Sequence, residues 1–318
     1  MQPLRLGLLG TGVAAEKLYL PAFEALRGRV DVVACANRTR KKAERYARLA
    51  RIPSVVGSAE ELFALPEVYA VMLSLPIDAQ PAYVLAALAA GKPVLSEKPV
   101  GPSVAGAKRL IKAARRYPVP WLVGENFTFM AHVQKLRALV AQKKLGELRL
   151  LEARQLTRMD AKNPYFHTAW RTAPRHVGGF VTDAGVHIAS LLRMLFGTPR
   201  VVKNLTASFD AKLPPLDTAL ALLRFDSGLV GTWTSSFTVA EAGPMLRVFG
   251  TRASAELFYD RLVVRAVSGR ETVHPAGVSS FRAELEHFAD VVQKGRPLAI
   301  TPEEALADLA LLEAVVAR

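Results

Sequence analysis

The stretch Leu4-Arg5-Leu6-Gly7-Leu8-Leu9-Gly10-Thr11-Gly12-Val13-Ala14-Ala15 decides the fold of the first part of the chain. Its apolar residues predict a strand over Leu4–Leu9, and a helix-like run to about Leu26 follows. A Gly-x-Gly-x-x-Ala pattern between a strand and a helix is typical of a turn that holds a dinucleotide pyrophosphate. Gly10 permits the tight turn, Gly12 lets the backbone approach the phosphates, and the helix N-terminus favours negative charge. The alternative is a glycine-rich turn without a ligand. The cofactor residues predicted here are Gly10, Thr11, Gly12, Val13 and Ala14.

The second predicted strand, Val30–Ala36, ends without the carboxylate that usually holds the ribose 2′-hydroxyl of NAD. The next residues include Asn37, Arg38 and Arg40. Guanidinium groups suit a 2′-phosphate, so this end of the strand favours NADP over NAD. The alternative is that both arginines are solvated residues at the start of a helix running to Leu49.

Alternating strands and helices continue as far as Gly124. Such repeats with short links predict a doubly wound parallel sheet with helices on both faces, a Rossmann domain over residues 1–124. The predicted helices are 59–64, 79–90 and 103–116, the last with Ser103 as its cap, and the predicted strands are 68–75, 92–96 and 119–124.

Within this alternation, the strand over 92–96 is followed directly by Glu97, Lys98 and Pro99. Ligands bind at the carboxyl edge of a doubly wound sheet, so this strand would deliver two opposite charges to the binding edge. The alternative is a surface turn that carries an ordinary ion pair.

After Gly124 the pattern changes, and strands dominate from Glu147 onward. Short strands at close spacing, two of them flanking the turn Asp226–Ser227–Gly228, predict an α+β domain over residues 125–318 with a large, mostly antiparallel open sheet. The two C-terminal helices can pack back on the first domain. The predicted helices are 133–143, 281–294 and 302–316, and the predicted strands are 148–156, 219–225, 229–237, 246–249, 255–259 and 262–266.

A second group of chemically active side chains follows an irregular stretch over Met159–Val177. Asp183 and His187 lie four residues apart in a predicted helix over Thr182–Phe196, and so share one face. We expect Gly185 between them to leave room on the adjacent surface. An acid and an imidazole at the start of a helix suit proton transfer. The alternative is that Asp183 caps the helix and His187 is a core histidine. No third ligand accompanies this pair, so no metal site is predicted.

Composition narrows the functional classes. The chain has 318 residues with 42 Lys and Arg against 28 Asp and Glu, a net charge of +14. The basic residues are scattered and not interleaved with aromatic ones, which argues against nucleic-acid binding. No apolar run has the length of a membrane helix, no signal peptide is evident, and Cys35 is the only cysteine. We expect a cytoplasmic protein.

Together these motifs resemble those of the Gfo/Idh/MocA oxidoreductases, the family of glucose–fructose oxidoreductase and inositol dehydrogenase. The resemblance covers nearly the whole chain and is carried by Gly10-Thr11-Gly12, Glu97-Lys98-Pro99 and Gly178-Gly179 followed by Asp183-x-Gly185-x-His187. It implies hydride transfer between a nicotinamide and a hydroxyl or carbonyl carbon of a sugar, cyclitol or related compound. It also implies a homodimer or homotetramer formed through the C-terminal sheet.

The resemblance assigns catalytic roles to Lys98, Asp183 and His187. Folding should bring these side chains around one substrate, with His187 as general base and Lys98 as hydrogen-bond donor to the reacting oxygen. Asp183 would orient substrate or pair with Lys98, and Glu97 would position the lysine or the nicotinamide ribose. The further cofactor contacts are Leu75, Pro76, Gln80, Glu97, Lys98 and Asn126, and the substrate contacts are Tyr165, Trp170 and Arg171.

Four positions depart from the family pattern: Gln80 stands for a histidine, Thr128 for an arginine, Val177 for a glycine and Ser190 for an acid. They leave the hydride-transfer residues in place and bear on the choice of substrate. A non-catalytic NADP-binding sensor on the same fold is the alternative function.

Overall fold

A computed structural model describes residues 2–240 and 243–317. The chain divides into two compact units. The first comprises Met1–Asn126 and Ser279–Leu306, and the second comprises Phe127–Val278 and Ala307–Arg318. The first unit therefore includes a segment from the C-terminal part of the sequence.

The first unit is built on a six-stranded sheet in the order β3-β2-β1-β4-β5-β6, with every pair of neighbours parallel. This is the doubly wound arrangement that the sequence predicts. β1 and β4 are buried on both faces of the sheet, which explains their nearly continuous apolar sequences. The strands are β1 (Leu4–Leu9), β2 (Val30–Ala36), β3 (Ser54–Val55), β4 (Ala70–Leu73), β5 (Val94–Glu97) and β6 (Trp121–Gly124).

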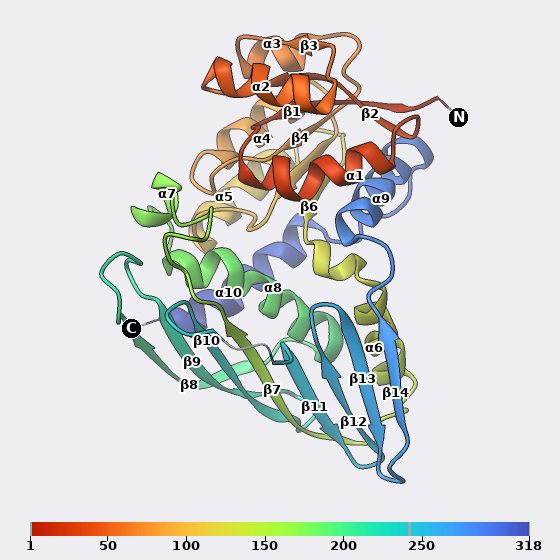
Figure 1. Ribbon diagram of the computed structural model, residues 1–318, viewed down its shortest axis with the longest axis vertical. Coiled ribbons are helices and arrows are strands. Elements are labelled where there is room, and N and C mark those ends of the chain that lie inside the picture. The colour runs from red at the N-terminus through yellow and green to blue at the C-terminus, as the bar shows by residue number, and fades with distance from the viewer. Residues whose placement is uncertain (1, 241–242, 318) are drawn as a thin grey trace. The chain divides into compact units, whose positions relative to one another are not determined.

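Helices cover both faces of this sheet. The helices α1 and α9 lie on one face, and α4 and α5 lie on the other (Figure 1). Ser103 caps α5 as predicted, because its hydroxyl accepts a hydrogen bond from the Gly106 N–H at 3.1 Å. The helices of this unit are α1 (Leu20–Ala25), α2 (Arg40–Ala50), α3 (Ala59–Ala64), α4 (Gln80–Ala89), α5 (Val104–Ala114) and α9 (Ser280–Lys294).

The helix predicted to run from the glycine turn to Leu26 differs in its first part. A π-helical turn, η1 (Ala15–Tyr19), precedes α1. Pro21 occupies the first turn of α1 and has no backbone N–H to donate to the preceding turn. A regular α-helix cannot keep its hydrogen bonds through this position, so the chain widens before it.

The second unit is built on an eight-stranded sheet in the order β14-β13-β12-β11-β7-β10-β9-β8. Among the strand pairs that the structure describes in this sheet, β7 and β10 are parallel and all the others are antiparallel. The sheet is therefore mostly antiparallel, as predicted. The strands are β7 (Leu148–Leu156), β8 (Arg200–Ala207), β9 (Thr218–Arg224), β10 (Val230–Ser236), β11 (Leu246–Gly250), β12 (Ala253–Leu257), β13 (Arg261–Ala266) and β14 (Glu271–Pro275).

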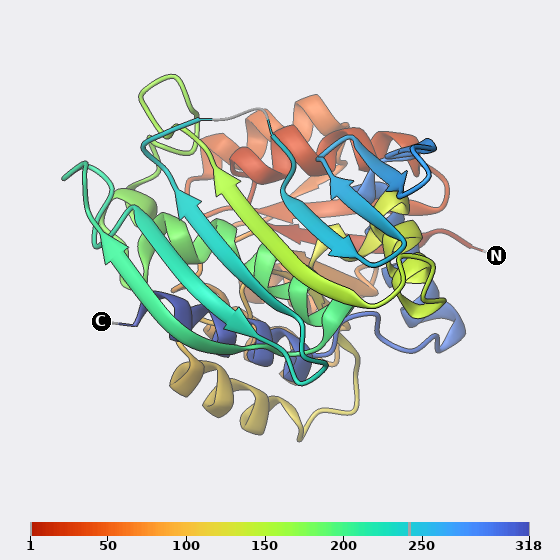
Figure 2. The same cartoon turned by 90° about the horizontal axis from the view of Figure 1, so that it is seen from below.

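One face of this sheet packs against helices and forms the core, with Trp233 fully buried. Figure 2 looks onto the opposite face, where the strands lie in front of the helix over 179–196. The helices of the unit are α6 (Ala131–Ala141), α7 (Ala169–Thr172), α8 (Gly179–Phe196) and the greater part of α10 (Pro302–Val316). A 3-10 turn, η2 (Asn126–Phe129), precedes α6.

The helix α8 is long and apolar enough to cross a membrane by length and composition. However, 72% of that stretch is buried inside the folded unit. This burial is typical of a core helix, and the apolar sequence of α8 is explained by its packing against the sheet.

Candidate active site

The carboxyl ends of the parallel strands form one edge of the first unit. The strand order reverses at β1, whose neighbours are β2 and β4, and ligands bind at such a switch point in doubly wound sheets. Gly10 follows β1, Asn37 follows β2, and Glu97 ends β5. Leu75 and Pro76 follow β4 at the same edge and are partly buried.

The glycine turn has a geometry that only glycine fits well. Gly10 has φ +97°, and a Cβ built there would lie 2.2 Å from the backbone oxygen of Ser74. A Cβ on Gly12 would meet no atom within 4 Å, so its backbone is open to a ligand. Val13 and Ala14 are partly buried where the chain enters the helix. This turn fits a diphosphate, since its backbone can be approached closely from the open side.

Side chains support the turn from β2. The Asn37 Nδ2 donates to the Thr11 hydroxyl at 2.8 Å, and the Asn37 Oδ1 accepts from the Thr39 N–H at 3.0 Å. Arg38 and Arg40 are exposed, and Arg40 Nε pairs with Glu44 at 2.9 Å. Both guanidinium groups therefore lie in solvent at the binding edge, where an exposed i,i+4 pair contributes little to stability.

Gln80 braces the segment that carries Lys98. Its amide Nε2 donates to the backbone oxygens of Glu97 at 2.5 Å and Pro99 at 3.2 Å. The side chain is buried, and its Oε1 has no hydrogen-bond partner among the described residues. The Lys98–Pro99 peptide bond is cis. Gln80, a predicted cofactor contact, thus holds the chain on either side of Lys98 through its Nε2.

Asn126 was also predicted as a cofactor contact. Its Nδ2 donates to the Ser280 hydroxyl at 2.8 Å, and both side chains are buried. This bond connects the end of the sheet to the start of α9. In this structure the Asn126 amide thus holds two segments of the first unit together.

In the second unit, Asp183 forms a buried ion pair. The Arg171 Nε lies 2.7 Å from the Asp183 Oδ2, with only 12% and 11% of the two side chains exposed. The guanidinium also lies over two aromatic rings, 3.8 Å from the centroid of Trp170 and 4.7 Å from that of Tyr165. The three predicted substrate residues therefore form one cluster around Asp183. Since α8 begins at Gly179, Asp183 lies within the helix and is not its cap.

His187 lies one turn further along α8 and is partly buried. Its imidazole stacks on Phe127, with ring centroids 4.4 Å apart and an angle of 10° between the planes. The room expected at Gly185 is absent. A Cβ there would lie 3.0 Å from Leu312 and 3.4 Å from Trp233, so the missing side chain serves close packing within the core.

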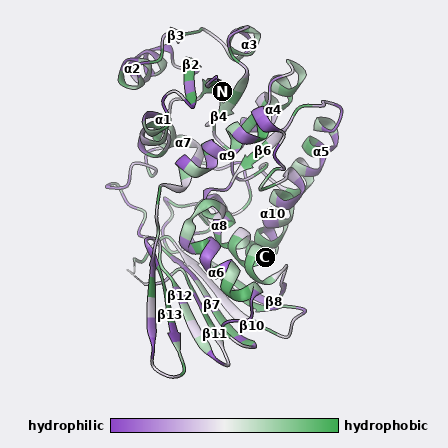
Figure 3. Cartoon of the chain, turned by 90° about the vertical axis from the view of Figure 1, so that its right-hand side faces the viewer, coloured by the Kyte–Doolittle hydropathy of each residue, from purple (hydrophilic) through white to green (hydrophobic). Residues whose placement is uncertain are grey.

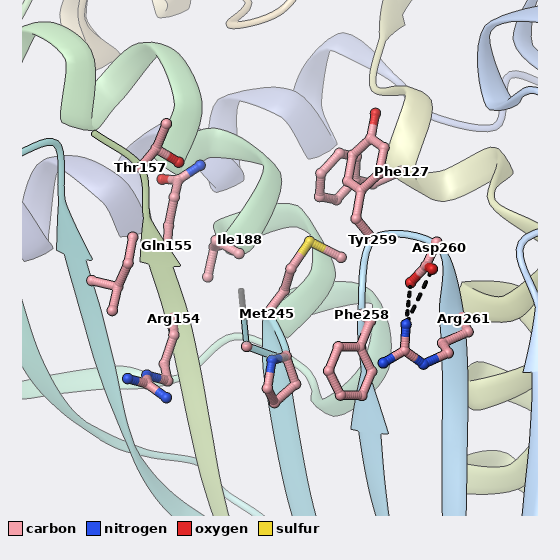
Figure 4. Close-up of a pocket in the computed structure, with 13 residues that line it drawn as sticks. Phe127, Arg154, Gln155, Thr157, Ile188, Met245, Phe258, Tyr259, Asp260 and Arg261 are labelled. Atoms are coloured by element: carbon pink, nitrogen blue, oxygen red, sulfur yellow. Dashed lines mark hydrogen bonds and ion pairs between the residues drawn. The ribbon is translucent and has the colours of Figure 1, made fainter. Parts of the chain in front are cut away.

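A pocket of about 520 Å³ opens beside this part of α8 (Figure 4). Phe127, the ring that stacks on His187, lines it together with Ile188. Figure 4 shows Gln155 and Thr157 at the end of β7 and Tyr259 next to Phe127. The Gln155 Oε1 is buried without a hydrogen-bond partner among the described residues. The remaining lining residues are Arg154, Leu156, Gly243, Pro244, Met245, Phe258, Asp260 and Arg261.

Each unit thus gathers one part of the predicted site. The first unit brings the glycine turn, Asn37, the two arginines and the Lys98 segment to one sheet edge, and the second brings Asp183, His187 and the predicted substrate residues to α8 and its neighbours. The sequence did not single out Phe127, Gln155 or Tyr259, whose approach depends on the fold. Among the described residues, no group of three or more His, Cys, Asp or Glu is arranged to hold a metal ion.

Comparison with known proteins identifies the family. Residues 4–125 match the oxidoreductase family with an NAD-binding Rossmann fold, and residues 133–256 match the GFO/IDH/MocA C-terminal domain. The chain belongs to the Gfo/Idh/MocA family of oxidoreductases.

Relatives of similar length support this assignment. Dehydrogenase FPY6 of Fusarium mangiferae is 30% identical over 98% of this chain and 95% of its own. The trans-1,2-dihydrobenzene-1,2-diol dehydrogenase of Bos taurus is 27% identical over 96% of this chain and 94% of its own. The crystal structure of an oxidoreductase from Thermotoga maritima superposes with a TM-score of 0.93 at 31% identity, covering 99% of this chain and 96% of that one.

Proposed function

We propose that this Gfo/Idh/MocA protein is an NADP-dependent dehydrogenase or reductase acting on a hydroxyl or carbonyl carbon of a small, cyclic, hydroxylated compound. The observation that carries the proposal is the sheet edge at which both an open glycine turn and the Lys98 segment lie. The turn suits a diphosphate, and a lysine at that edge suits stabilisation of negative charge on a reacting oxygen.

NADP is preferred over NAD because of the residues after β2. Arg38 and Arg40 are exposed at that strand end, and the carboxylate that would accept a hydrogen bond from a ribose 2′-hydroxyl is missing there. Asn37 is held against Thr11, so the start of this loop is fixed beside the glycine turn. The guanidinium groups would then pair with a 2′-phosphate.

The proposed chemistry divides among three side chains. When bound, the nicotinamide exchanges a hydride at its C4 atom. Lys98 donates a hydrogen bond to the reacting oxygen and stabilises its negative charge. His187 takes the hydroxyl proton in the oxidising direction and returns it in the reducing one, because an imidazole nitrogen can accept a proton and an imidazolium can donate it. Asp183, paired with Arg171, holds the start of α8 and orients the substrate.

The substrate is proposed to enter the pocket beside α8. Its volume of about 520 Å³ suits a small molecule, and its lining combines aromatic rings with the amide of Gln155 and the hydroxyls of Thr157 and Tyr259. Such a lining suits a ring compound that carries hydroxyl groups, which includes sugars, cyclitols and dihydrodiols. The bovine relative named for a dihydrobenzenediol falls within this class.

A second copy of the chain is the proposed partner of the open sheet. Leu150, Leu205, Leu220, Leu222 and Val230 lie on one face of β7, β10, β9 and β8 and are exposed, Leu205 by 61%. We call these five residues the apolar sheet face, and Figure 2 looks onto the strands that carry them. An apolar patch of this kind is typical of a protein interface, and a homodimer or homotetramer would cover it.

The other half of the same face differs. Arg247 pairs with Glu256, and Arg265 pairs with Glu256 and Glu271, across β11 to β14. Figure 3 shows hydrophilic segments on β13. This contrast favours a contact through the half of the sheet formed by β7, β8, β9 and β10.

The test of the function is cofactor binding followed by turnover. NADPH fluorescence should report binding, and its absorbance should fall when the correct carbonyl substrate is added from a panel of aldoses, cyclitol ketones and diketones. NADP should be reduced by the matching alcohols or dihydrodiols. A protein that binds NADPH and never consumes it over the whole panel would be a sensor, the alternative for this fold.

A further inference from the structure

A buried carboxyl group lies behind the sheet edge and has no part in the chemistry proposed above. Glu284, on α9, has 0% of its surface exposed. The Tyr19 hydroxyl lies 3.0 Å from its Oε2, and its Oε1 has no hydrogen-bond partner among the described residues. Gly124, at the end of β6, leaves the space for it, because a Cβ there would lie 3.3 Å from that Oε1. A carboxylate in this position would be costly without a partner.

The same tyrosine also faces Glu97. The Glu97 carboxyl lies within hydrogen-bonding reach of the Tyr19 hydroxyl, so one hydroxyl serves two acids. A tyrosine has a single proton to donate and two lone pairs that accept. Two ionised carboxylates around it cannot both receive that proton, whereas a protonated and an ionised one can be satisfied together.

The electrostatics favour the proton on Glu284. Burial raises the pKa of Glu284 well above its usual range, the charges of Glu97 and Glu125 raise it further, and only the Tyr19 hydrogen bond lowers it. These are the ionisable groups that act on it from η1, from β5 and from the residue after β6. Burial and the same neighbouring acids also raise the pKa of Tyr19 well above its usual value, so the tyrosine remains protonated.

We propose that Glu284 is a protonated carboxylic acid that donates its hydrogen bond to Tyr19, which in turn donates to Glu97 and fixes the backbone that carries Lys98. The Glu284 proton bridges the 3.0 Å contact to the tyrosine oxygen, and the tyrosine proton is then free for the Glu97 carboxylate. Glu97 immediately precedes Lys98, and Gln80 holds its backbone oxygen. Glu284 is thus a positioning residue. The expected effect of Glu284 on turnover rests on the function proposed above. The protonation of Glu284 does not.

Infrared spectroscopy tests the protonation directly and needs no substrate. The difference spectrum of wild type minus Glu284→Gln at pH 7 should contain the carbonyl stretch of a protonated carboxylic acid, shifted in D₂O. Glu286→Gln is the matched control, since Glu286 lies on the same helix and is exposed in a pair with Arg282, and its difference spectrum should lack the band. Absence of the band for Glu284 would overturn the proposal. If Glu284→Gln does not fold, carboxyl NMR of ¹³C-labelled wild type detects the same protonated glutamate or its absence.

Stability gives a second test with a definite sign. The folded protein keeps a proton that an unfolded glutamate, with its ordinary pKa of 4.5, releases. The stability of wild type relative to Glu284→Gln should therefore fall as the pH rises above about 4.5, by up to tenfold in the unfolding equilibrium constant per pH unit, until the folded pKa is reached. A pH-independent difference would show that Glu284 is ionised in both states.

Turnover tests the positioning. Glu284→Gln keeps a neutral donor of the same shape, and kcat at pH 7 should stay within about threefold of wild type. Tyr19→Phe removes the bridging hydroxyl and should lower kcat about tenfold while the Kd for NADPH changes less. A folded Tyr19→Phe enzyme with full kcat, or a Glu284→Gln enzyme as impaired as Tyr19→Phe, would refute the positioning role.

Discussion

The ion pair between Arg171 and Asp183 gives the prediction that can be worked out furthest from the structure. Arg171→Ala leaves the Asp183 carboxylate, 11% exposed, without its partner at 2.7 Å. Removing one member of a buried ion pair typically costs about 3–5 kcal/mol. The contacts of the guanidinium with Trp170 and Tyr165 add about 0.5–1 kcal/mol each. Water can enter the vacated space and partly solvate the carboxylate, which reduces the loss, so we expect about 3 kcal/mol, the lower end of this range.

Thermal unfolding measures this loss. For the 318-residue chain, about 3 kcal/mol lowers Tm by about 4 °C if the chain unfolds as a whole, and by more if the second unit unfolds first. Arg158→Ala is the matched control, because Arg158 pairs with Asp160 at 3.3 Å with 71% of its side chain exposed. We expect no measurable change in Tm for this control.

A double-mutant cycle decides whether the charge pair is responsible. Asp183→Asn removes the carboxylate charge that Arg171 neutralises, so the double variant should be more stable than the sum of the two single losses predicts. A Tm for Arg171→Ala within 1 °C of wild type, or strictly additive losses in the cycle, would refute the reasoning.

Three further predictions concern the cofactor turn and the open sheet. Gly10→Ala should lower Tm and abolish NADPH binding at concentrations that saturate wild type, because its Cβ would lie 2.2 Å from the Ser74 oxygen; retained binding in a fluorescence titration would contradict this. Arg38→Ala should raise the Kd for NADPH about tenfold and leave that for NADH nearly unchanged, and equal losses for both would remove the 2′-phosphate argument. Leu222→Asp, in the apolar sheet face and 51% exposed, should lower the oligomer mass measured by light scattering, whereas Leu49→Asp, 48% exposed on α2, should not; an unchanged mass for Leu222→Asp would refute the proposed contact.

The sequence predicted those parts of the fold whose pattern is local. The bounds of β1, β2, α3, β7 and α10 agree with the structure because apolar periodicity and flanking turn residues specify them. The predictions missed β3, which has two residues, and the edge strands β8 and β14. The two edge strands are largely exposed, so they lack the apolar alternation that marks a strand with one buried face.

The site was predictable where a motif has its own geometry. The turn at Gly10 was found because its backbone conformation requires glycine, and the strand predicted over 92–96 ends one residue before the end of β5 at Glu97. The partners of these residues were not predictable, since they come from distant parts of the chain. In the sequence, Glu284 is one acidic residue of an amphipathic helix. Only the packing of α9 within the first unit brings it to Tyr19.

The same reason accounts for contacts that the sequence did not predict. The amides of Gln80 and Asn126, two predicted cofactor contacts, bind the backbone around Lys98 and the Ser280 hydroxyl. Gly185 provides close packing against Leu312, a residue more than a hundred positions away. Side chains with several hydrogen-bonding options take the partners that tertiary structure supplies, and a motif alone does not specify them.

Lys98→Met tests the central claim most directly. With a substrate found in the panel, NADPH oxidation should slow by about 100-fold or more, because the donor to the reacting oxygen is lost. The Kd for NADPH, measured by fluorescence on the same preparation, should change by less than about threefold, since the glycine turn and Arg38 are intact. Unchanged turnover in Lys98→Met, with NADPH bound normally, would contradict the account.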